Sequence, residues 1–430
     1  MRTMTTSTFI RAFAAAAALA ALSRPAPAQA PLTARSLGTA GSAVAGARGV
    51  DALFFNPANL ALAGNPAWSV CIPQAAVRTG FVGTSLGDVP SLLRFNRWSQ
   101  AEKDAFIAGV PAEGLNARVD VTVPVASVQV RGLALGVSVT RSYSQNVGRD
   151  VADLLVNGYQ QGRTDYAVGN TSGRNASWVD VSGAYGRRLG PVSVGVAAHY
   201  VAGRALAQSR LFEPTFDLEA EDLSVELREV SAHGGHGWGI DVGVAAQPNP
   251  RLTVSAAVSN ALSGMKWSTD LRTKSLVLTR GDFSRTGAIE ARDRFDASEA
   301  ALDPAAVPLS VYETAQGLYD GAWLPATLRV GAAYLATPRT HLTAAFQGAL
   351  DEGALSGGWR RQLSAGVEQG VGRVLSLRAG TGTDLGGAWM LSGGAGVGPL
   401  QLGVARTGEP AGSARSSGWT FALGFTARGR

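Results

Sequence analysis

The chain has 430 residues and a formal net charge of +6, and only 16% of its residues are charged, against roughly 25% in a typical soluble domain. Glycine contributes 54 residues, nearly double its usual share of about 7%. Past the N-terminus no run approaches the roughly 18 apolar residues of a membrane helix, so the composition excludes a helical membrane protein and leaves a soluble β-rich protein or a membrane β-barrel.

The first 28 residues have the pattern of a secretory signal peptide. Arg2 and Arg11 form a positive n-region, and Phe13–Leu22 is an apolar h-region too short to span a bilayer as an anchor. Small-residue cleavage sites end at Ala28 and at Ala30, and we favour Ala28 because the other site places a proline just after the cut. Removing residues 1–28 takes away three arginines and no acid, so the charge falls from +6 to +3 and gives no indication of nucleic-acid binding.

Residues 29–66 form a glycine-rich segment that ends in an apolar stretch with one distinctive turn. Asparagine before proline is pushed from helical toward extended geometry, so a turn is predicted at Asn56, Pro57 and Ala58. Three large apolar residues flank this motif, namely Phe54, Phe55 and Leu60. They either contact a hydrophobic ligand or only anchor the segment to a wall, and for the phenylalanines we favour the anchor.

From Trp68 onward, segments with a period of two recur, with bulky apolar residues on one face and small or polar residues on the other. Val192, Val194 and Val196, for example, alternate with Ser193 and Gly195. Each segment has about the 9–11 residues that a tilted strand needs to cross a bilayer. We predict fourteen strands, the first of them the least certain: 67–79, 118–130, 132–142, 176–188, 191–203, 238–247, 250–261, 325–336, 339–349, 361–370, 373–382, 388–397, 399–407 and 417–427.

The connections between these strands alternate between tight turns and long links. The long links are residues 80–117, 143–175, 204–237, 262–324, 350–360, 383–387 and 408–416. Short turns at one end, long loops at the other and an even strand number are the pattern of an outer-membrane barrel. The predicted fold class is therefore all-β, an antiparallel transmembrane β-barrel over residues 67–430 with long extracellular loops, in the outer membrane of a Gram-negative cell.

Tryptophans gather at the long-loop end of this pattern. Seven of the nine lie there, which predicts an interfacial aromatic belt: Trp178, Trp238, Trp267, Trp323, Trp359, Trp389 and Trp419. The last strand, at 417–427, resembles the C-terminal signature that the outer-membrane barrel assembly machinery recognises. That machinery, outer-membrane lipid and lipopolysaccharide are therefore the expected partners, and nucleic acid is not.

Five charged residues fall on the small or polar face of the predicted strands: Asp180, Asp241, Arg329, Glu368 and Arg378. An arginine exposed to lipid at mid-depth costs roughly 2–4 kcal/mol, so we expect these side chains to point into the lumen. There they pair with one another or with the N-terminal segment, and we favour this structural role over a role in transport.

Other candidate chemistry is sparse. His233 and His236 lack further metal ligands at useful spacing, and the acidic stretch 211–230 is better explained as a solvated loop than as a cation site. Residues 298–302 are a candidate helical turn within the long link. No Gly-x-Ser-x-Gly elbow is present, and we expect no catalytic residue, no metal and no cofactor.

Residues 36–66, with the Asn-Pro-Ala motif at 56–58, resemble the N-terminal plug of the FadL-like outer-membrane transporters. They are similar also to the related PorV-type barrels of gliding-bacterium secretion systems, which share that opening. The resemblance implies a fourteen-stranded barrel whose lumen is blocked by the folded-in segment 29–66. In the transporter branch it implies that hydrophobic molecules bind on the outer side and leave sideways through the wall, helped by movement of the plug.

Three functions remain open on this basis. We favour a passive channel for hydrophobic small molecules such as long-chain fatty acids. The alternative is a PorV-like barrel that tethers or shuttles secreted proteins without transporting solutes, and an outer-membrane enzyme is the least favoured. A bound detergent or fatty chain inside the barrel beside Phe54 and Phe55 would favour transport, whereas a lumen tightly filled by the plug inside a continuous hydrogen-bonded wall would favour the scaffold.

Overall fold

The computed structural model describes the chain from the plug to the last strand, with gaps in the long loops. The described residues are 33–84, 94, 97–112, 114–160, 162–163, 165–212, 215–217, 222–279, 299–305, 307–320, 322–350, 361–408 and 417–429. The predicted signal peptide 1–28 lies outside them, as do residues 29–32 of the predicted plug.

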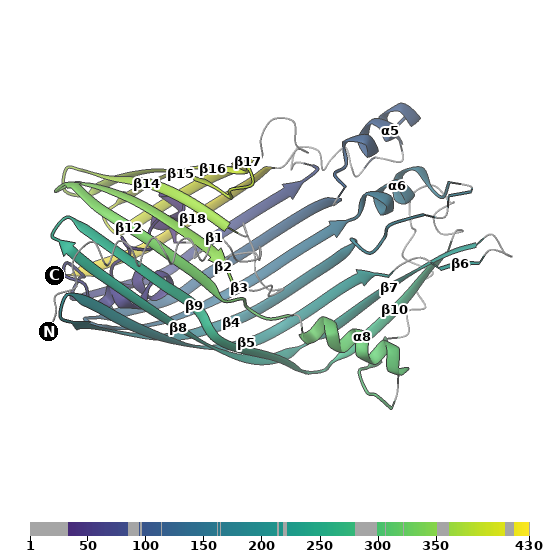
Figure 1. The fold of residues 1–430 in the computed structure, drawn as a ribbon, viewed down its shortest axis with the longest axis horizontal. Helices are drawn as coiled ribbons and strands as arrows, with labels where there is room; N and C mark the ends of the chain where they lie inside the picture. Colours follow the sequence, from purple (N-terminus) through teal and green to yellow (C-terminus); the bar gives the residue numbers. More distant parts are fainter. Residues whose placement is uncertain are drawn as a thin grey trace.

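Fourteen strands close into one antiparallel barrel, which confirms the predicted fold class (Figure 1). The wall runs in the order β1-β2-β3-β4-β5-β8-β9-β12-β13-β14-β15-β16-β17-β18, and β1 pairs with β18 to close it. The bounds are β1 Trp68–Val82, β2 Leu115–Val130, β3 Leu133–Val147, β4 Ser172–Leu189, β5 Val192–Leu211, β8 Gly234–Asn249, β9 Leu252–Thr269, β12 Thr327–Thr337, β13 Thr340–Ala349, β14 Arg361–Val371, β15 Leu375–Thr383, β16 Trp389–Val397, β17 Leu400–Gly408 and β18 Ser417–Gly429.

The predicted division of the strands into two faces is confirmed. On β5, Tyr200 points outward with 56% of its surface exposed, while Ser193 on the opposite face is 2% exposed. Every barrel strand presents at least one exposed large hydrophobic residue, from a single residue on β9, β12, β13 and β15 to a row of four on β18: Leu262, Tyr334, Leu342 and Leu377, and then Trp419, Phe421, Leu423 and Phe425. A closed sheet pairs all its backbone groups internally, so a greasy outer surface of this kind suits a hydrocarbon environment.

One side of the barrel is much taller than the other. Strands β1 to β5, β8 and β9 have 15–20 residues, whereas β12 to β18 have 9–13. Figure 1 shows the tall side continuing beyond the rim at the end opposite the two termini. Four further strands extend it: β6 Thr215–Asp217, β7 Asp222–Ala232, β10 Arg272–Thr279 and β11 Glu299–Ala301.

This extension corrects the prediction that 204–237 and 262–324 are loops. β5 runs on to pair with β7, and β7 pairs with β10, so 204–237 is largely strand and the described part of 262–324 contains strands and the helix α8. The expected helical turn at 298–302 is wrong as well, because Glu299–Ala301 pairs with Arg272–Lys274 as a strand. A strand above the membrane does not need a row of apolar residues that faces lipid. The acidic residues of this region therefore do not show the alternation from which the other strands were predicted.

Short helices complete the fold at both ends of the barrel. In the plug they are α2 Ala34–Gly38, α3 Asp51–Phe55 and the 3-10 helix η1 Pro57–Ala61, and beyond the rim they are α5 Gln100–Gly109, α6 Arg149–Asn157 and α8 Leu309–Asp320. None of the helices in the described ranges has the length and apolarity of a membrane-crossing helix.

Two tryptophans depart from the predicted aromatic belt. Trp178 and Trp267 are 4% and 3% exposed, and they pack in an apolar cluster with Val201, Leu206 and Tyr319 of α8. Trp238 and Trp419 do lie exposed on the outside. The belt is therefore only partly formed by these residues, because Trp178 and Trp267 lie on the inner face of their strands, and Trp359 lies outside the described residues.

Candidate functional site

The Asn-Pro-Ala motif of the plug begins a helix and fastens it to the wall. Asn56 is the N-cap of η1, where its Oδ1 accepts a hydrogen bond from the Ala58 backbone N–H at 2.9 Å and Pro57 occupies the first helical position. Its side-chain amide donates across the lumen to the carbonyls of Val244 on β8 and Ala256 on β9. One side chain thus shapes the plug and holds it in register with two strands.

Glycines of the wall make room for the plug around most of the barrel. A Cβ added to Gly195 on β5 would lie 2.3 Å from the Ala58 nitrogen, and one on Gly380 of β15 would lie 2.5 Å from the Thr39 carbonyl carbon. Further inward glycines meet the plug in the same way, on β3, β4, β8, β12, β14, β16 and β17: Gly136, Gly186, Gly243, Gly331, Gly366, Gly394 and Gly403. The plug therefore fills its level of the lumen, and part of the glycine excess is explained.

The three apolar residues beside the motif lie in different surroundings. Phe55 is buried against Val44 and Ala345, and Leu60 is buried against wall alanines such as Ala184. Both anchor the plug. Phe54 is only half-buried and forms, together with Leu53, the floor of a cavity in the lumen.

This cavity, the chamber, has a volume of about 170 Å³ and lies between the plug and the long-loop end of the barrel. An engineered apolar cavity of about 150 Å³ holds a benzene molecule, so the chamber has room for one aromatic ring or a short piece of an alkyl chain. Its lining joins apolar groups such as Phe54, Trp178 and Leu324 to polar groups on eight strands.

The polar wall of the chamber is centred on His199 of β5. Its Nδ1 lies 3.3 Å from the Asp180 carboxylate on β4, and its Nε2 lies 3.0 Å from the Asp241 carboxylate on β8. Asp241 also accepts a hydrogen bond from the Asn260 backbone at 2.7 Å. The chamber therefore presents fixed hydrogen-bonding groups at one side and an apolar floor at its base.

Arg329 of β12 connects the chamber wall to the plug. Its guanidinium donates to the Phe54 carbonyl at 3.3 Å, in the last turn of α3, and to the Ser259 hydroxyl on β9. A cation at a helix C-terminus is stabilised by the helix dipole and by the unpaired carbonyls there. Arg329 thus holds the edge of the chamber floor in place.

The five charges predicted to face the lumen lie there in two groups. Asp180, Asp241 and Arg329 surround the chamber, whereas Glu368 and Arg378 pair at 2.9 Å at the level of the plug, where Arg35 of α2 also binds Glu368 at 2.8 Å. Sequence reasoning missed Arg35 and missed His199 as the centre of the first group. A histidine on an otherwise small and polar strand face was the available signal for His199.

Beside the chamber, the pairing between β9 and β12 ends where β12 begins. In the part of the chain that the structure describes, the ladder between these strands ends at the pair Ser259–Thr327. Beyond it, side chains hold β9 to the segment that leads into β12: Asn260 Nδ2 donates to the Pro325 carbonyl at 3.3 Å, and Trp267 Nε1 donates to the Ala322 carbonyl at 3.0 Å. We name this stretch, Asn260–Trp267 facing Ala322–Pro325, the lateral window.

Leu324 and Pro325 line the chamber as well as the lateral window, so the two are adjacent. The cluster around Trp178, Trp267 and Tyr319 covers the inner face of the tall side next to them. Tyr319 fixes α8 there, because its hydroxyl binds the carbonyls of Ser231 and Arg272. Burial raises the pKa of Tyr319 to about 12, so the phenol is neutral at ordinary pH.

The other predicted features contribute no site of their own. His233 pairs with Asp270 at 3.0 Å on the exposed junction of β9 and β10. In the acidic stretch, Glu226 pairs with Arg228 along β7, and residues 213–214 and 218–221 lie outside the described residues. Among the residues that the structure describes, no three histidine, cysteine or acidic side chains gather as metal ligands would.

Comparison with known proteins shows which fold the chain shares. Residues 215–402, less than half of the chain, match a family described only as a family of unknown function, DUF5723. No curated protein matches. Among solved structures, the toluene transporter TbuX of Ralstonia pickettii has 15% identity and a TM-score of 0.51, and the alignment covers 94% of this chain and 99% of the other.

Two further structures agree with this comparison. A FadL homologue of Pseudomonas aeruginosa has 13% identity, a TM-score of 0.50 and coverage of 94% and 100%, and the toluene transporter TodX of P. putida has 12% identity, a TM-score of 0.50 and coverage of 93% and 99%. The chain therefore has the fold of the FadL-type barrels, which confirms the resemblance drawn from the sequence at the level of fold.

Proposed function

We propose that this protein is a passive, non-enzymatic conduit through which small molecules with an apolar body cross the outer membrane. The observation that carries the proposal is the position of the chamber, above a plug that fills the lumen and beside a window in the wall. The proposed route leads from the extracellular side over the apolar cluster at Trp178 and Trp267, into the chamber, and out between β9 and β12 into the membrane.

The chamber lining restricts which molecules suit this route. An apolar ring or chain is accommodated on Phe54, while a polar group on the same molecule gains hydrogen bonds from the wall around His199. Long-chain fatty acids and substituted aromatic compounds have this combination. Toluene, which the names of two structural neighbours mention, is the matching probe that lacks the polar group.

A PorV-like scaffold is the second candidate, favoured by the close packing of the plug against the wall glycines. A barrel that only tethers proteins does not need a chamber next to the place where the pairing of β9 with β12 ends. We therefore prefer the conduit. In either case we propose an outer-membrane location, with lipid around the apolar outer face, lipopolysaccharide near the long loops, and β18 as the strand that the assembly machinery reads.

The test is an uptake assay in liposomes with the lateral window bridged. Asn260→Cys and Pro325→Cys, in a Cys71→Ser background, are joined by a short thiol-specific crosslinker, and uptake of oleate and toluene is compared before and after bridging. We expect bridging to lower uptake at least tenfold.

The matched control is Val254→Cys with Ala332→Cys, a directly paired couple lower on the same two strands. Bridging it should leave uptake within a factor of two. If liposomes with the unbridged protein take up neither probe faster than empty liposomes, the conduit hypothesis is refuted and the scaffold hypothesis remains. Equal uptake by the bridged window variant would refute the lateral route.

A further inference from the structure

Positive charge exceeds negative charge at the level of the plug. Four arginines meet two carboxylates there: Arg35 and Arg378 share Glu368, and Arg428 of β18 binds Asp51 of α3 at 2.9 Å. The fourth, Arg48, has no carboxylate within ion-pair distance among the described residues. Its guanidinium donates to the carbonyls of Ala45 and Ala47 and to the Thr253 hydroxyl. These four arginines and two acids form the arginine cluster.

An uncompensated charge is costly at this position. The wall and plug partly bury Arg48, and this burial, with the neighbouring charges of Arg35 and Arg428, lowers the pKa of Arg48 to about 10. A guanidinium remains protonated at neutral pH in spite of such a shift, so the repulsion persists. A buried charge without a counter-charge is destabilising, and a bound anion would relieve it.

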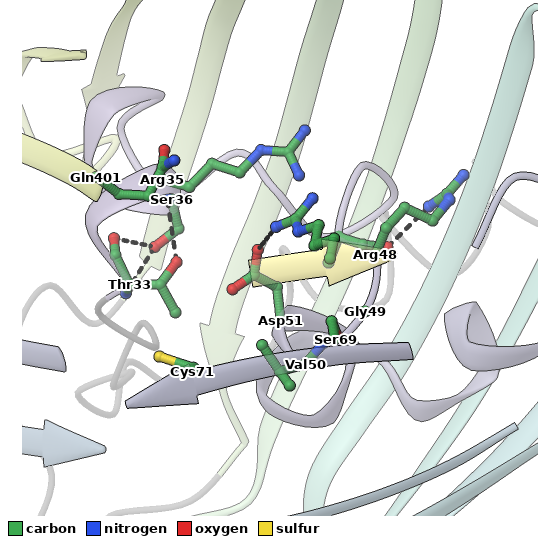
Figure 2. A network of polar contacts seen from close by, with 12 residues as sticks. Thr33, Arg35, Ser36, Arg48, Gly49, Val50, Asp51, Ser69, Cys71 and Gln401 are labelled. Carbon is green, nitrogen blue, oxygen red and sulfur yellow. Dashed lines mark hydrogen bonds and ion pairs between the residues drawn. The ribbon is translucent and has the colours of Figure 1, made fainter. Parts of the chain in front are cut away.

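The cluster also has hydrogen-bond donors to offer. The Nη1 groups of Arg35 and Arg378 are buried and have no acceptor among the described residues. Water still reaches the surroundings, because the side chains of Arg35 and Arg428 keep 21% and 31% of their surface exposed. Figure 2 shows Arg35 and Arg48 extending from two separate segments of the plug.

We propose that the arginine cluster binds an oxyanion, either a phosphate or a carboxylate, at the end of the lumen where the tight turns and the two chain termini lie. Guanidinium groups match the planar edges of carboxylates and phosphates, which accept paired hydrogen bonds from them. In a barrel of this orientation the tight-turn end faces the periplasm, so the anion arrives from that side. The site lies on the opposite side of the plug from the chamber and does not depend on the transport proposal.

Calorimetric titration of the full mature protein in detergent tests the site, with inorganic phosphate, butyrate and octanoate as separate probes against chloride at equal ionic strength. We expect saturable binding of at least one oxyanion, and a loss of at least tenfold in affinity in Arg48→Gln. Arg251→Gln, at an exposed turn at the same end of the barrel, is the matched control and should bind within a factor of two of the wild type.

The probes distinguish the two sources of the anion. Binding of phosphate alone assigns the site to a free inorganic anion, whereas octanoate binding more tightly than butyrate assigns it to the head group of an amphiphile. Circular dichroism confirms that each variant is folded, and Arg48→Lys, which keeps the charge, should retain part of the affinity. If the wild type binds none of the three probes, or if Arg48→Gln binds as tightly as the wild type, the site does not exist.

Discussion

Replacing Gly195 with alanine should loosen the plug. The new Cβ would lie 2.3 Å from both the Ala58 nitrogen and the Pro57 carbonyl carbon, a separation that real Cβ atoms do not tolerate. Both contacts are backbone atoms, so no side chain can rotate to relieve them. Overpacking of this kind costs about 1–3 kcal/mol.

Labelling of the Cys71 thiol can measure this loosening of the plug. Cys71 of β1 is the only cysteine of the chain and is buried beside the plug (Figure 2). If labelling of the thiol requires the plug to withdraw, the rate follows the population of the open state. Each factor of ten in this population corresponds to about 1.4 kcal/mol. An overpacking cost of about 1–3 kcal/mol therefore predicts that Cys71 is labelled roughly 5- to 140-fold faster in Gly195→Ala than in the wild type.

The control is Gly80→Ala on β1, where an added Cβ meets no atom within 4 Å. It should label Cys71 at the wild-type rate, provided that circular dichroism shows all three proteins folded. Wild-type labelling in Gly195→Ala would refute the conclusion that the plug is wedged against the wall glycines.

Three further perturbations test individual contacts. Asn56→Ala removes the cap of η1 and two hydrogen bonds to the wall. It should lower the free energy of unfolding in urea by about 1–3 kcal/mol and speed the labelling of Cys71. An unchanged labelling rate would contradict the role of the motif. Arg329→Gln removes the charged clamp on the Phe54 carbonyl and should cost about 1.5–3 kcal/mol, whereas wild-type stability would show that the clamp contributes nothing. Tyr319→Phe frees α8 from two carbonyls and should expose it to limited proteolysis. Because the pKa of Tyr319 is raised to about 12, the same attachment should be intact below pH 10 and lost as the pH rises through 12, and cleavage that does not change over this range would count against it.

Much of the barrel could be predicted from local chemistry. Each wall strand faces lipid on one side, and this imposes a period of two that is legible in segments such as 191–203. The strands above the membrane are free of that constraint, so β7 and β10 were missed. Trp178 and Trp267 were misplaced because their height along the strand was considered without the face on which they lie. Trp178 shares the inward face of β4 with Asp180, and both rings belong to the same inner cluster.

The candidate site was harder to foresee, because it depends on the register between distant strands. The pairing of His199 with Asp180 and Asp241 joins three strands, and the contact of Arg329 with the Phe54 carbonyl spans 275 positions in the sequence. The Asn-Pro-Ala motif did predict a turn, because that preference is local. Its attachment to Val244 and Ala256 could be seen only in the folded barrel.

The most direct test of the whole account is uptake with the plug locked to the wall. The hydroxyls of Ser42 in the plug and Thr343 on β13 are 2.6 Å apart, so Ser42→Cys with Thr343→Cys, in a Cys71→Ser background, should form a disulfide. If solutes leave through the lateral window above a fixed plug, oxidised and reduced proteins will take up oleate at the same rate in liposomes. Uptake that stops on oxidation and returns on reduction would place the route through the plug and contradict the account.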